Sequence, residues 1–386
     1  MNNSKYYRKI FLLLASAAIL RFIFLPLIEN EGISNIIKFP IILFVLIFGA
    51  FYVLKGSADI IEETTDILSH KTKLAGGLLQ SIGTAFPDMI LGIIAALVSL
   101  NLRESNYDLA INYAIIAATT TFGSNIYNVG YATWCLFRQN LANTKKKTIR
   151  LFPYLNTGFV KPIGEHARKP TFDELDNGIN IMVLLSMITA FVAFSMVVFG
   201  RVLKVPSGTN EDLFQLVLPV GVIVFLLCIL IMFAFRKAKK PEGGFEEVKE
   251  GEDFFSRKSI LFILGFLVLS GITIMFSAET MVHAIVKFCE ITNIPFAIAG
   301  VLAGLIGCLG EILVVHSYTV KGTGRIGDAV VGVAMDNVVT IMGAAIVAIM
   351  GGIFLGGNSL ILLFVAILAI NIVLISQISK LKNWVN

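Results

Sequence analysis

Charged residues are scarce in this sequence: Asp, Glu, Lys and Arg make up 15% of its 386 residues, whereas 56% are hydrophobic and the mean hydropathy is +0.83. A soluble domain could not remove so much apolar surface from water, so the composition excludes an ordinary soluble protein and indicates an integral membrane protein. Each apolar run of about 20 residues is expected to be a helix, because the backbone must satisfy its own hydrogen bonds in lipid.

Cysteine and histidine are scarce as well, with four residues of each type. All four cysteines fall in apolar segments, so no disulfide framework is expected. Neither residue type clusters at the short spacings that a zinc site requires. The sequence therefore predicts no cofactor, and the polar chemistry must come from carboxylates, amides and hydroxyls.

Long apolar runs are what the sequence has in abundance. They predict ten membrane-spanning helices, at about 10–28, 36–58, 74–100, 108–137, 179–200, 214–235, 259–288, 294–320, 327–351 and 357–379. The first run has a basic start like a signal peptide, but Arg21 interrupts it and FLPLIENEG is a poor cleavage site, so we expect a helix. A charged loop at 236–258 separates an N-terminal half, 1–235, from a C-terminal half, 259–386.

The distribution of Lys and Arg predicts the orientation in the membrane. With both termini in the cytoplasm, 25 of the 31 basic residues lie on the cytoplasmic side and five lie at the outer ends of helices. Cytoplasmic loops of membrane proteins carry such an excess. We therefore expect a multi-pass protein of the plasma membrane with the 138–178 and 236–258 loops inside. This topology explains the net charge of +5 and gives no indication of a nucleic-acid partner.

Two stretches of the chain resemble each other. Residues 56–88 and 276–311 both begin near a Ser-Ala-acid triplet and end in a glycine-rich run closed by an acid, Asp88 or Glu311. The next helix of each half carries a polar cluster, TTTFGSNIYN at 119–128 and GVAMDNVVT at 332–340. The copies are offset by five helices, and an odd offset inverts the second copy in the membrane. Inverted repeats are typical of secondary transporters with a site near the midplane, although chance similarity between glycine-rich helices is the competing explanation.

Three carboxylates, those of Asp88, Glu311 and Asp336, are surrounded by apolar sequence. A charge in the bilayer centre costs a few kcal/mol, so each acid must be protonated, paired or bound to a cation. No Lys or Arg occurs near the middle of the helices at 74–100, 108–137, 294–320 and 327–351, which disfavours an internal salt bridge. Protons or cations remain as the partners.

Helical spacing gathers oxygen atoms around the first acid. Ser81, Thr84 and Asp88 follow one another at intervals of three and four and so share a helix face. Pro87 has no N–H, which leaves the carbonyl of Gly83 without its usual partner. A free carbonyl beside a carboxylate suits a hard cation.

Two further helices supply oxygen ligands. Thr121, Asn125 and Asn128 share a face of one helix, and Asp336 and Thr340 share a face of another. Ca²⁺ takes about six to eight oxygen ligands in flexible geometry, and carboxylates, amides and backbone carbonyls all qualify. The predicted metal site therefore comprises five principal and six secondary candidates. The principal candidates are Asp88, Glu311, Asn125, Asp336 and Thr84; the secondary candidates are Gly83, Ser124, Asn128, Gly307, Cys308 and Thr340.

Structural roles compete at several of these positions. Asn125 could be an interhelical hydrogen-bonding residue, Ser124 and Thr84 could be small packing residues, and Cys308 could be a small buried hydrophobe. His283 and His316 are expected to pack or to lie at an interface rather than to relay protons. Gly304, Gly307 and Gly310 recur every three residues, a pattern that lets another helix approach closely.

The first-half residues GTAFPD at 83–88 resemble the GTSLPE signature of the calcium/cation antiporter superfamily, especially its sodium/calcium exchanger branch. Residues GSNIYN at 123–128 resemble the GSNIFN that follows it in that family, and Glu311 and Asp336 fall where the acids of the second repeat belong. The resemblance implies one cation site made by both repeats, at which calcium is exchanged for sodium or protons by alternating access. It also implies that Asp88 and Glu311 are the central carboxylates, with Asn125 and Asp336 as ligands from the following helices.

The chain departs from this family pattern at several positions. Ala85 and Cys308 replace the signature serines, Gly307 and Gly310 replace the second threonine and proline, and Met335 stands where a serine is common. The lost hydroxyls are expected to weaken sodium sites more than the calcium site. The family core usually ends with a helix that is missing here, and an extra helix precedes the core.

Other functions remain open from sequence alone. An intramembrane aspartyl protease would need a Gly-x-Gly-Asp motif, but residues 325–328 read RIGD. A channel could use the same oxygens. A non-transporting relative that acts as a cation sensor or assembly partner is the main alternative to an antiporter of Ca²⁺ and a monovalent cation.

Overall fold

The computed structural model describes residues 3–72, 76–166, 169–205, 212–235, 254–255, 258–321 and 326–385. Most of the charged loop at 236–258 thus lies outside the described residues. The elements are α1 (Asn3–Ile19), η1 (Leu20–Phe24), α2 (Leu25–Glu29), α3 (Asn35–Phe48), η2 (Gly49–Leu54), α4 (Lys55–Thr72), α5 (Gly76–Leu102), α6 (Tyr107–Lys145), β1 (Ile149–Arg150), β2 (Phe159–Val160), η3 (Ile163–Glu165), α7 (Phe172–Phe199), β3 (Leu213–Gln215), α8 (Leu218–Phe235), α9 (Ile260–Thr292), α10 (Phe296–Gly307), α11 (Leu309–Lys321), α12 (Ile326–Ile349), β4 (Phe354–Gly356) and α13 (Gly357–Lys382).

The all-α membrane fold expected from the composition is confirmed. Within the described residues, eight helical segments are long and apolar enough to cross a membrane, and the bent pair α10–α11 makes a ninth. The segment α6 does not pass the same hydropathy test, although it is a continuous helix of 39 residues. The count of ten spans and the inverted repeat remain predictions.

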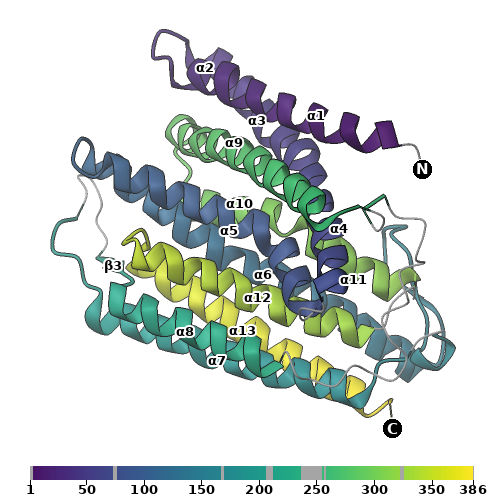
Figure 1. Cartoon of the computed structure of the whole chain (residues 1–386). Helices are drawn as coiled ribbons and strands as arrows, with labels where there is room; N and C mark the ends of the chain where they lie inside the picture. Colours follow the sequence, from purple (N-terminus) through teal and green to yellow (C-terminus); the bar gives the residue numbers. More distant parts are fainter. Residues whose placement is uncertain are drawn as a thin grey trace.

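The helices run roughly side by side in a layered bundle, with both ends of the chain at the same end of the bundle (Figure 1). The helices α1, α3 and α4 pack against α9 and form one layer. The helices α5, α6 and α10 lie in the middle and pack against one another, and α12, α13, α8 and α7 lie beyond them. The helices that carry Asp88, Asn125 and Asp336 are therefore neighbours in the interior of the bundle.

The helices around the 138–178 loop are longer than the apolar pattern predicts. The helix expected at 108–137 extends to Lys145, and the helix expected from residue 179 already begins at Phe172. Capping explains the earlier start: the side chain of Thr171 accepts a hydrogen bond from the Glu174 N–H, and Glu174 accepts one from the Thr171 N–H. Polar helical turns outside the apolar run carry no hydropathy signal, so sequence analysis missed them.

Arg21, which interrupts the first apolar run, is paired inside the bundle. Its guanidinium lies 2.9 Å from Oε2 of Glu279 on α9 and 4.6 Å from the centre of the Phe276 ring. Near the C-terminal end of the same span, Nδ1 of His283 on α9 lies 2.8 Å from Oε1 of Glu29. These contacts explain how a charged residue is tolerated in this span. They also fix the extra first span against α9.

Candidate cation site

Asp88 lies in the middle of the bundle on α5. The helix runs through Pro87 without a break, and Asp88 is fully buried. Among the described residues, no donor lies in hydrogen-bond geometry to either carboxylate oxygen. A buried carboxylate without compensation is costly, so its position indicates a proton or a cation as the missing partner.

Helix α10 approaches Asp88 so closely that only glycine fits at position 307. A Cβ at this position would overlap Oδ1 of Asp88 and would lie 2.7 Å from its Cγ and 3.1 Å from its Cα. Two other glycines on the same helix allow close contact with α6: a Cβ on Gly304 would lie 2.8 Å from the N–H nitrogen of Ser124, and a Cβ on Gly300 would overlap Thr119 Oγ1. Gly310 has open space around its Cβ position, so the close approach uses residues 300, 304 and 307 rather than 310.

The span expected at 294–320 is present as a bent pair of helices. Helix α10 ends at Gly307 and α11 begins at Leu309, with a bend of 52° between them. The residue at the break, Cys308, has the non-helical dihedrals φ −92° and ψ 11°. Glycine favours helix poorly, and the glycines at 304, 307 and 310 lower the cost of interrupting the helix here.

The break places a second acid in the neighbourhood of Cys308. Glu311 lies in the first turn of α11 and is 2% exposed. A negative charge is favoured at this end of a helix, because the unpaired N–H groups carry partial positive charge. The buried thiol of Cys308 has the carboxylates of both Asp88 and Glu311 as electrostatic neighbours.

Helices α6 and α12 complete the surroundings of Asp88. Ser124 of α6 and Asp336 of α12 are its polar neighbours. The Ser124 hydroxyl donates its hydrogen bond to the Thr121 carbonyl at 3.0 Å, which leaves a lone pair for another ligand. On α12, the Thr340 hydroxyl is likewise engaged, because it donates to the Asp336 carbonyl at 2.9 Å.

Asn128 lies one turn beyond Ser124 on α6. It is 1% exposed, and within the described part of the chain neither its amide oxygen nor its amide nitrogen has a hydrogen-bond partner. A buried amide without a partner costs about 1–3 kcal/mol, so Asn128 also indicates a missing ligand or water.

Asn125 lines a separate cavity. This cavity, of about 10 Å³, lies between α6, α7, α12 and α13, and none of the three acids lines it. Its polar residues are Asn125, Thr189, Asn337 and Asn371. The volume and the polar lining suit about one ordered water. Sequence analysis missed Asn337 and Asn371; the signal that could have found Asn337 is its place directly after Asp336 in the polar cluster.

Two predicted ligands cannot be placed. Gly83 and Thr84 belong to α5, but their side-chain environments lie outside the described part of the structure. Among the described residues, no group of three or more His, Cys, Asp or Glu side chains is close enough to hold a metal ion. Asp88 and Asp336 are therefore neighbours in this structure, but the three acids do not converge on one point.

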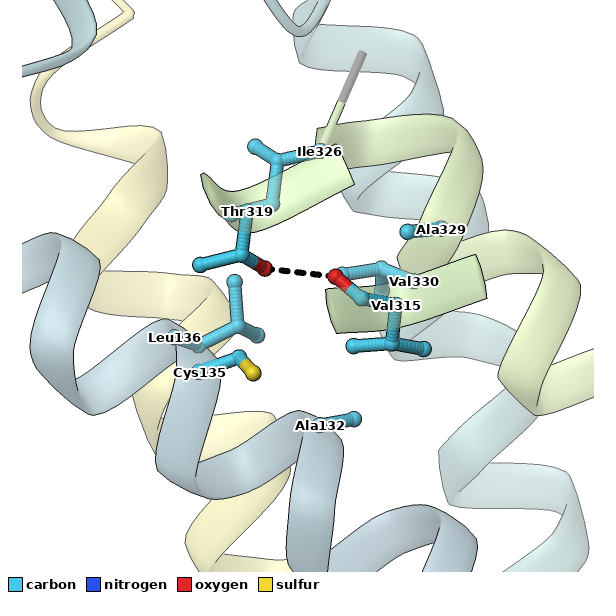
Figure 2. A pocket seen from close by; sticks show the side chains of 8 residues that line it. All are labelled: Ala132, Cys135, Leu136, Val315, Thr319, Ile326, Ala329 and Val330. Atoms are coloured by element: carbon cyan, nitrogen blue, oxygen red, sulfur yellow. Dashed lines mark hydrogen bonds between the residues drawn. The ribbon is translucent and has the colours of Figure 1, made fainter. Parts of the chain in front are cut away.

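A second small cavity, shown in Figure 2, lies between α6, α11 and α12 and has mainly apolar walls. Its polar groups are the Cys135 thiol and the Thr319 hydroxyl, which donates to the Val315 carbonyl at 2.8 Å. It contains no acid, so it is not a candidate cation site.

Two histidines attach α6 to other helices. The Tyr113 hydroxyl lies 2.8 Å from Nδ1 of His283 on α9, and the Tyr131 hydroxyl lies 2.7 Å from Nδ1 of His316 on α11. The two tyrosines flank Ser124 along α6. These contacts fit the expected packing roles of the histidines, but sequence analysis did not identify their tyrosine partners.

The chain is similar to known proteins in structure rather than in sequence. No protein-family model and no curated protein matches the sequence. The solved structure of the H+/Ca²⁺ exchanger CAX is similar, with a TM-score of 0.59 and 14% identity over 97% of this chain and 87% of that chain. Native YfkE is also similar, with a TM-score of 0.53 and 12% identity over 97% of this chain and 98% of that chain. A selenium-substituted form, described as a Ca²⁺/H+ antiporter protein, has a TM-score of 0.50 and 13% identity over the same shares of the two chains.

The chain has the fold of the calcium/cation antiporters. Both similarities cover 97% of the chain, so the antiporter fold extends over both halves and is not confined to the helices with the signature residues. Within this antiporter fold, Asp88 and Ser124 come from the first half, and Glu311, Cys308 and Asp336 come from the second. Asp88 of the first half and Asp336 of the second thus become neighbours where α5 packs against α12.

Proposed function

We propose that the protein is a secondary active antiporter that exchanges Ca²⁺ for H+ or Na+ by alternating access. The observation that carries this proposal is Asp88, a fully buried carboxylate whose oxygens have no hydrogen-bond partner among the described residues, with Asp336 beside it. Among the described ion pairs none involves Asp88, so a mobile cation or proton is the charge partner that its surroundings leave open.

The ligand set of the proposed site consists mainly of oxygen atoms. Asp88, Glu311 and Asp336 would provide the charge that a divalent cation needs, and Ser124 and Asn128 would provide neutral oxygens. Oxygen donors in a flexible arrangement suit Ca²⁺. Because the described acids do not converge in this structure, cation binding would draw α5, α11 and α12 together, and this movement is what we expect alternating access to use.

Proton coupling follows from the same residues. Three carboxylates in a low-dielectric interior cannot all remain ionised when the cation leaves, so protons would take its place. Sodium coupling would need further neutral oxygens, and Ala85 and Cys308 lack the hydroxyls that the sequence resemblance leads one to expect. We therefore propose substantial competition by protons and weak dependence on sodium.

The arrangement in the membrane belongs to the same proposal. The excess of basic residues in the 138–178 and 236–258 loops supports a plasma-membrane protein with both termini in the cytoplasm. The correspondence between α5–α6 and α10–α12 supports two inverted repeats, in the halves 1–235 and 259–386. Lipid and the transported cations are the partners that this function requires.

Flux of radioactive calcium into proteoliposomes, driven by an imposed proton or sodium gradient, tests the function. Asp88→Asn and Glu311→Gln should each abolish flux without loss of folding, because each removes a charge that the cation needs. Asp212→Asn is the matched control: its carboxylate is exposed and pairs with Arg201 on the surface, so flux should be unchanged.

Flux near the wild-type rate with either site variant would refute the shared site. Calcium binding without flux in the unmodified protein would instead identify a non-transporting cation sensor.

A further inference from the structure

Cys308 occupies a special place in the fold. It is the residue at the break between α10 and α11, its side chain is fully buried, and the carboxylates of Asp88 and Glu311 are both its neighbours. The thiol makes only a weak contact, a donation to the Leu305 carbonyl at 3.5 Å. The sulfur is therefore available to a ligand at the junction of the two helices.

An independent observation also indicates a ligand at this junction. The Asp88 carboxylate is directed at Gly307, the residue before Cys308, and a Cβ there would overlap its Oδ1. Both of its oxygens are buried and without a hydrogen-bond partner. A carboxylate directed at Gly307 and the thiol of the next residue thus lie at the same bend, and the carboxylate has no hydrogen-bond partner among the described residues.

The other cysteines differ from Cys308 in their surroundings. All four are buried and free. Cys135 lines the mainly apolar cavity of Figure 2, and Cys228 lies within the apolar helix α8. Cys308 is the one that has two buried carboxylates as neighbours, so its sulfur alone adds to a charged site.

Sulfur changes which cations a carboxylate site prefers. Carboxylate and carbonyl oxygens suit Ca²⁺, Mg²⁺ and Mn²⁺, whereas thiolate selects softer metals. Zinc combines cysteine sulfur with carboxylate oxygen in proteins, and Cd²⁺ is a softer ion of the same charge. A hydroxyl at position 308 would leave only oxygen donors at the site, whereas a thiol adds a sulfur donor to them.

We propose that Cys308 determines the cation specificity of the site, so that a thiophilic divalent cation such as Cd²⁺ binds there in preference to Ca²⁺. The inference rests on the location of the site in the proposed function and adds a substrate class to it. When the cation binds, the thiol releases its proton to the medium and a metal–sulfur bond forms. The two charges of the cation are then balanced by the thiolate and one ionised carboxylate, while the other carboxylate keeps its proton.

Equilibrium titration of the purified full-length protein with Cd²⁺ tests this inference. A cadmium–thiolate bond gives a charge-transfer absorption in the ultraviolet that calcium–oxygen ligation lacks. The unmodified protein should show this band, and it should saturate at a single Cd²⁺ per chain and decrease when Ca²⁺ is added in excess. Cys308→Ser should lose the band, and its ratio of Cd²⁺ to Ca²⁺ affinity should fall by about tenfold or more, as expected when a soft ligand becomes a hard one.

Cys228→Ser is the matched control, because it removes an equally buried thiol that has no acid as an electrostatic neighbour among the described residues. It should keep the band and the affinity ratio. Retention of the band in Cys308→Ser, or an unchanged affinity ratio, would overturn the inference. Loss of the band in Cys228→Ser as well would also overturn it, because the sulfur ligand would then not be specific to position 308.

The readout separates this inference from the proposed function. Cadmium binding that depends on Cys308, in a protein that shows no calcium flux, would refute antiport and support the site. Calcium flux that depends on Asp88, with a Cd²⁺ to Ca²⁺ ratio indifferent to Cys308, would support antiport and refute the role of the thiol.

Discussion

Gly307 is the position at which the packing of the fold and the proposed site meet most closely. Replacement by alanine adds one methyl group, whose carbon would overlap Oδ1 of Asp88 and lie 2.7 Å from Cγ and 3.1 Å from Cα. The contact with Cα involves backbone, so rotation of the Asp88 side chain cannot relieve it. Both a side-chain shift and a separation of α10 from α5 by a few tenths of an ångström are needed.

The energetic consequence follows from these distances. Overpacking in a well-packed core costs about 1–3 kcal/mol, and an off-rotamer side chain about 0.5–1.5 kcal/mol. We expect Gly307→Ala to lower the free energy of unfolding by about 2–3 kcal/mol on these values. Displacement of a positioned group by about 1 Å can cost up to ~100-fold in activity, so calcium flux should fall by at least about tenfold.

Thermal unfolding in detergent and calcium flux in proteoliposomes measure the two effects separately. Gly310→Ala is the control for the substitution itself, because its Cβ position has no neighbour within 4 Å. It should preserve flux and stabilise α11 by about 0.5–1 kcal/mol, the usual gain from glycine to alanine within a helix. Gly304→Ala is the control for helix packing, because its Cβ would meet backbone atoms of Ser124 and Thr120 at 2.8 Å without touching Asp88.

The expected order of calcium affinities among these glycine variants is therefore specific to the site. Gly304→Ala and Gly307→Ala should both destabilise the protein, but Gly307→Ala should reduce calcium affinity more. Normal flux and normal stability in Gly307→Ala would show that α10 does not approach Asp88 as described. Equal loss of affinity in both variants would show that packing, rather than the position of the carboxylate, is responsible.

Three further predictions concern the first span, the orientation and the coupling ion. Arg21→Ala should lower the free energy of unfolding by about 2 kcal/mol, the value of a charge-assisted hydrogen bond. The loss should be much smaller when Glu279 is already alanine. Additive losses in thermal unfolding would contradict this pairing. In a variant without the native cysteines, Leu203→Cys should react with impermeant thiol reagents in intact cells and Leu155→Cys should not. Both side chains are exposed, but they lie on opposite sides of the membrane in the proposed topology. The reverse labelling pattern would show that the orientation in the membrane is inverted. Calcium flux should change with pH in the absence of sodium and respond weakly to sodium at fixed pH; steep sodium dependence with no effect of pH would show that the missing hydroxyls do not weaken sodium coupling.

Composition and periodicity were sufficient to predict the structural class of the protein. The apolar runs dictate helices, because lipid offers no hydrogen bonds to the backbone. The positions of Asp88, Glu311 and Asp336 within those runs identified the unusual residues, because a charge in an apolar helix is costly wherever the helix packs. The glycine pattern also indicated that another helix approaches near residue 307.

What the pattern could not determine is which neighbour each helix face meets. Asn125 and Asn128 share a face by spacing, but the packed structure places Asn125 in a cavity with Asn337 and Asn371, while Ser124 lies beside Asp88. A helix of this length has neighbours on several sides, and a rotation of only part of a turn decides which side chain faces which helix. Those rotations are fixed by contacts between residues far apart in the chain.

The break at Cys308 shows most clearly what the sequence determines and what only the tertiary structure determines. The sequence by itself determined that residues 294–320 are apolar, glycine-rich and long enough to cross the membrane, and it placed Glu311 in that segment. Only the tertiary structure decided that the helix ends at Gly307 and restarts at Leu309, because the close packing of residues 300, 304 and 307 against α5 and α6 fixes α10, while α11 packs against α6 and α12 in another direction. A local sequence of weak helix formers permits such a break, but its position depends on the neighbours that each half must contact.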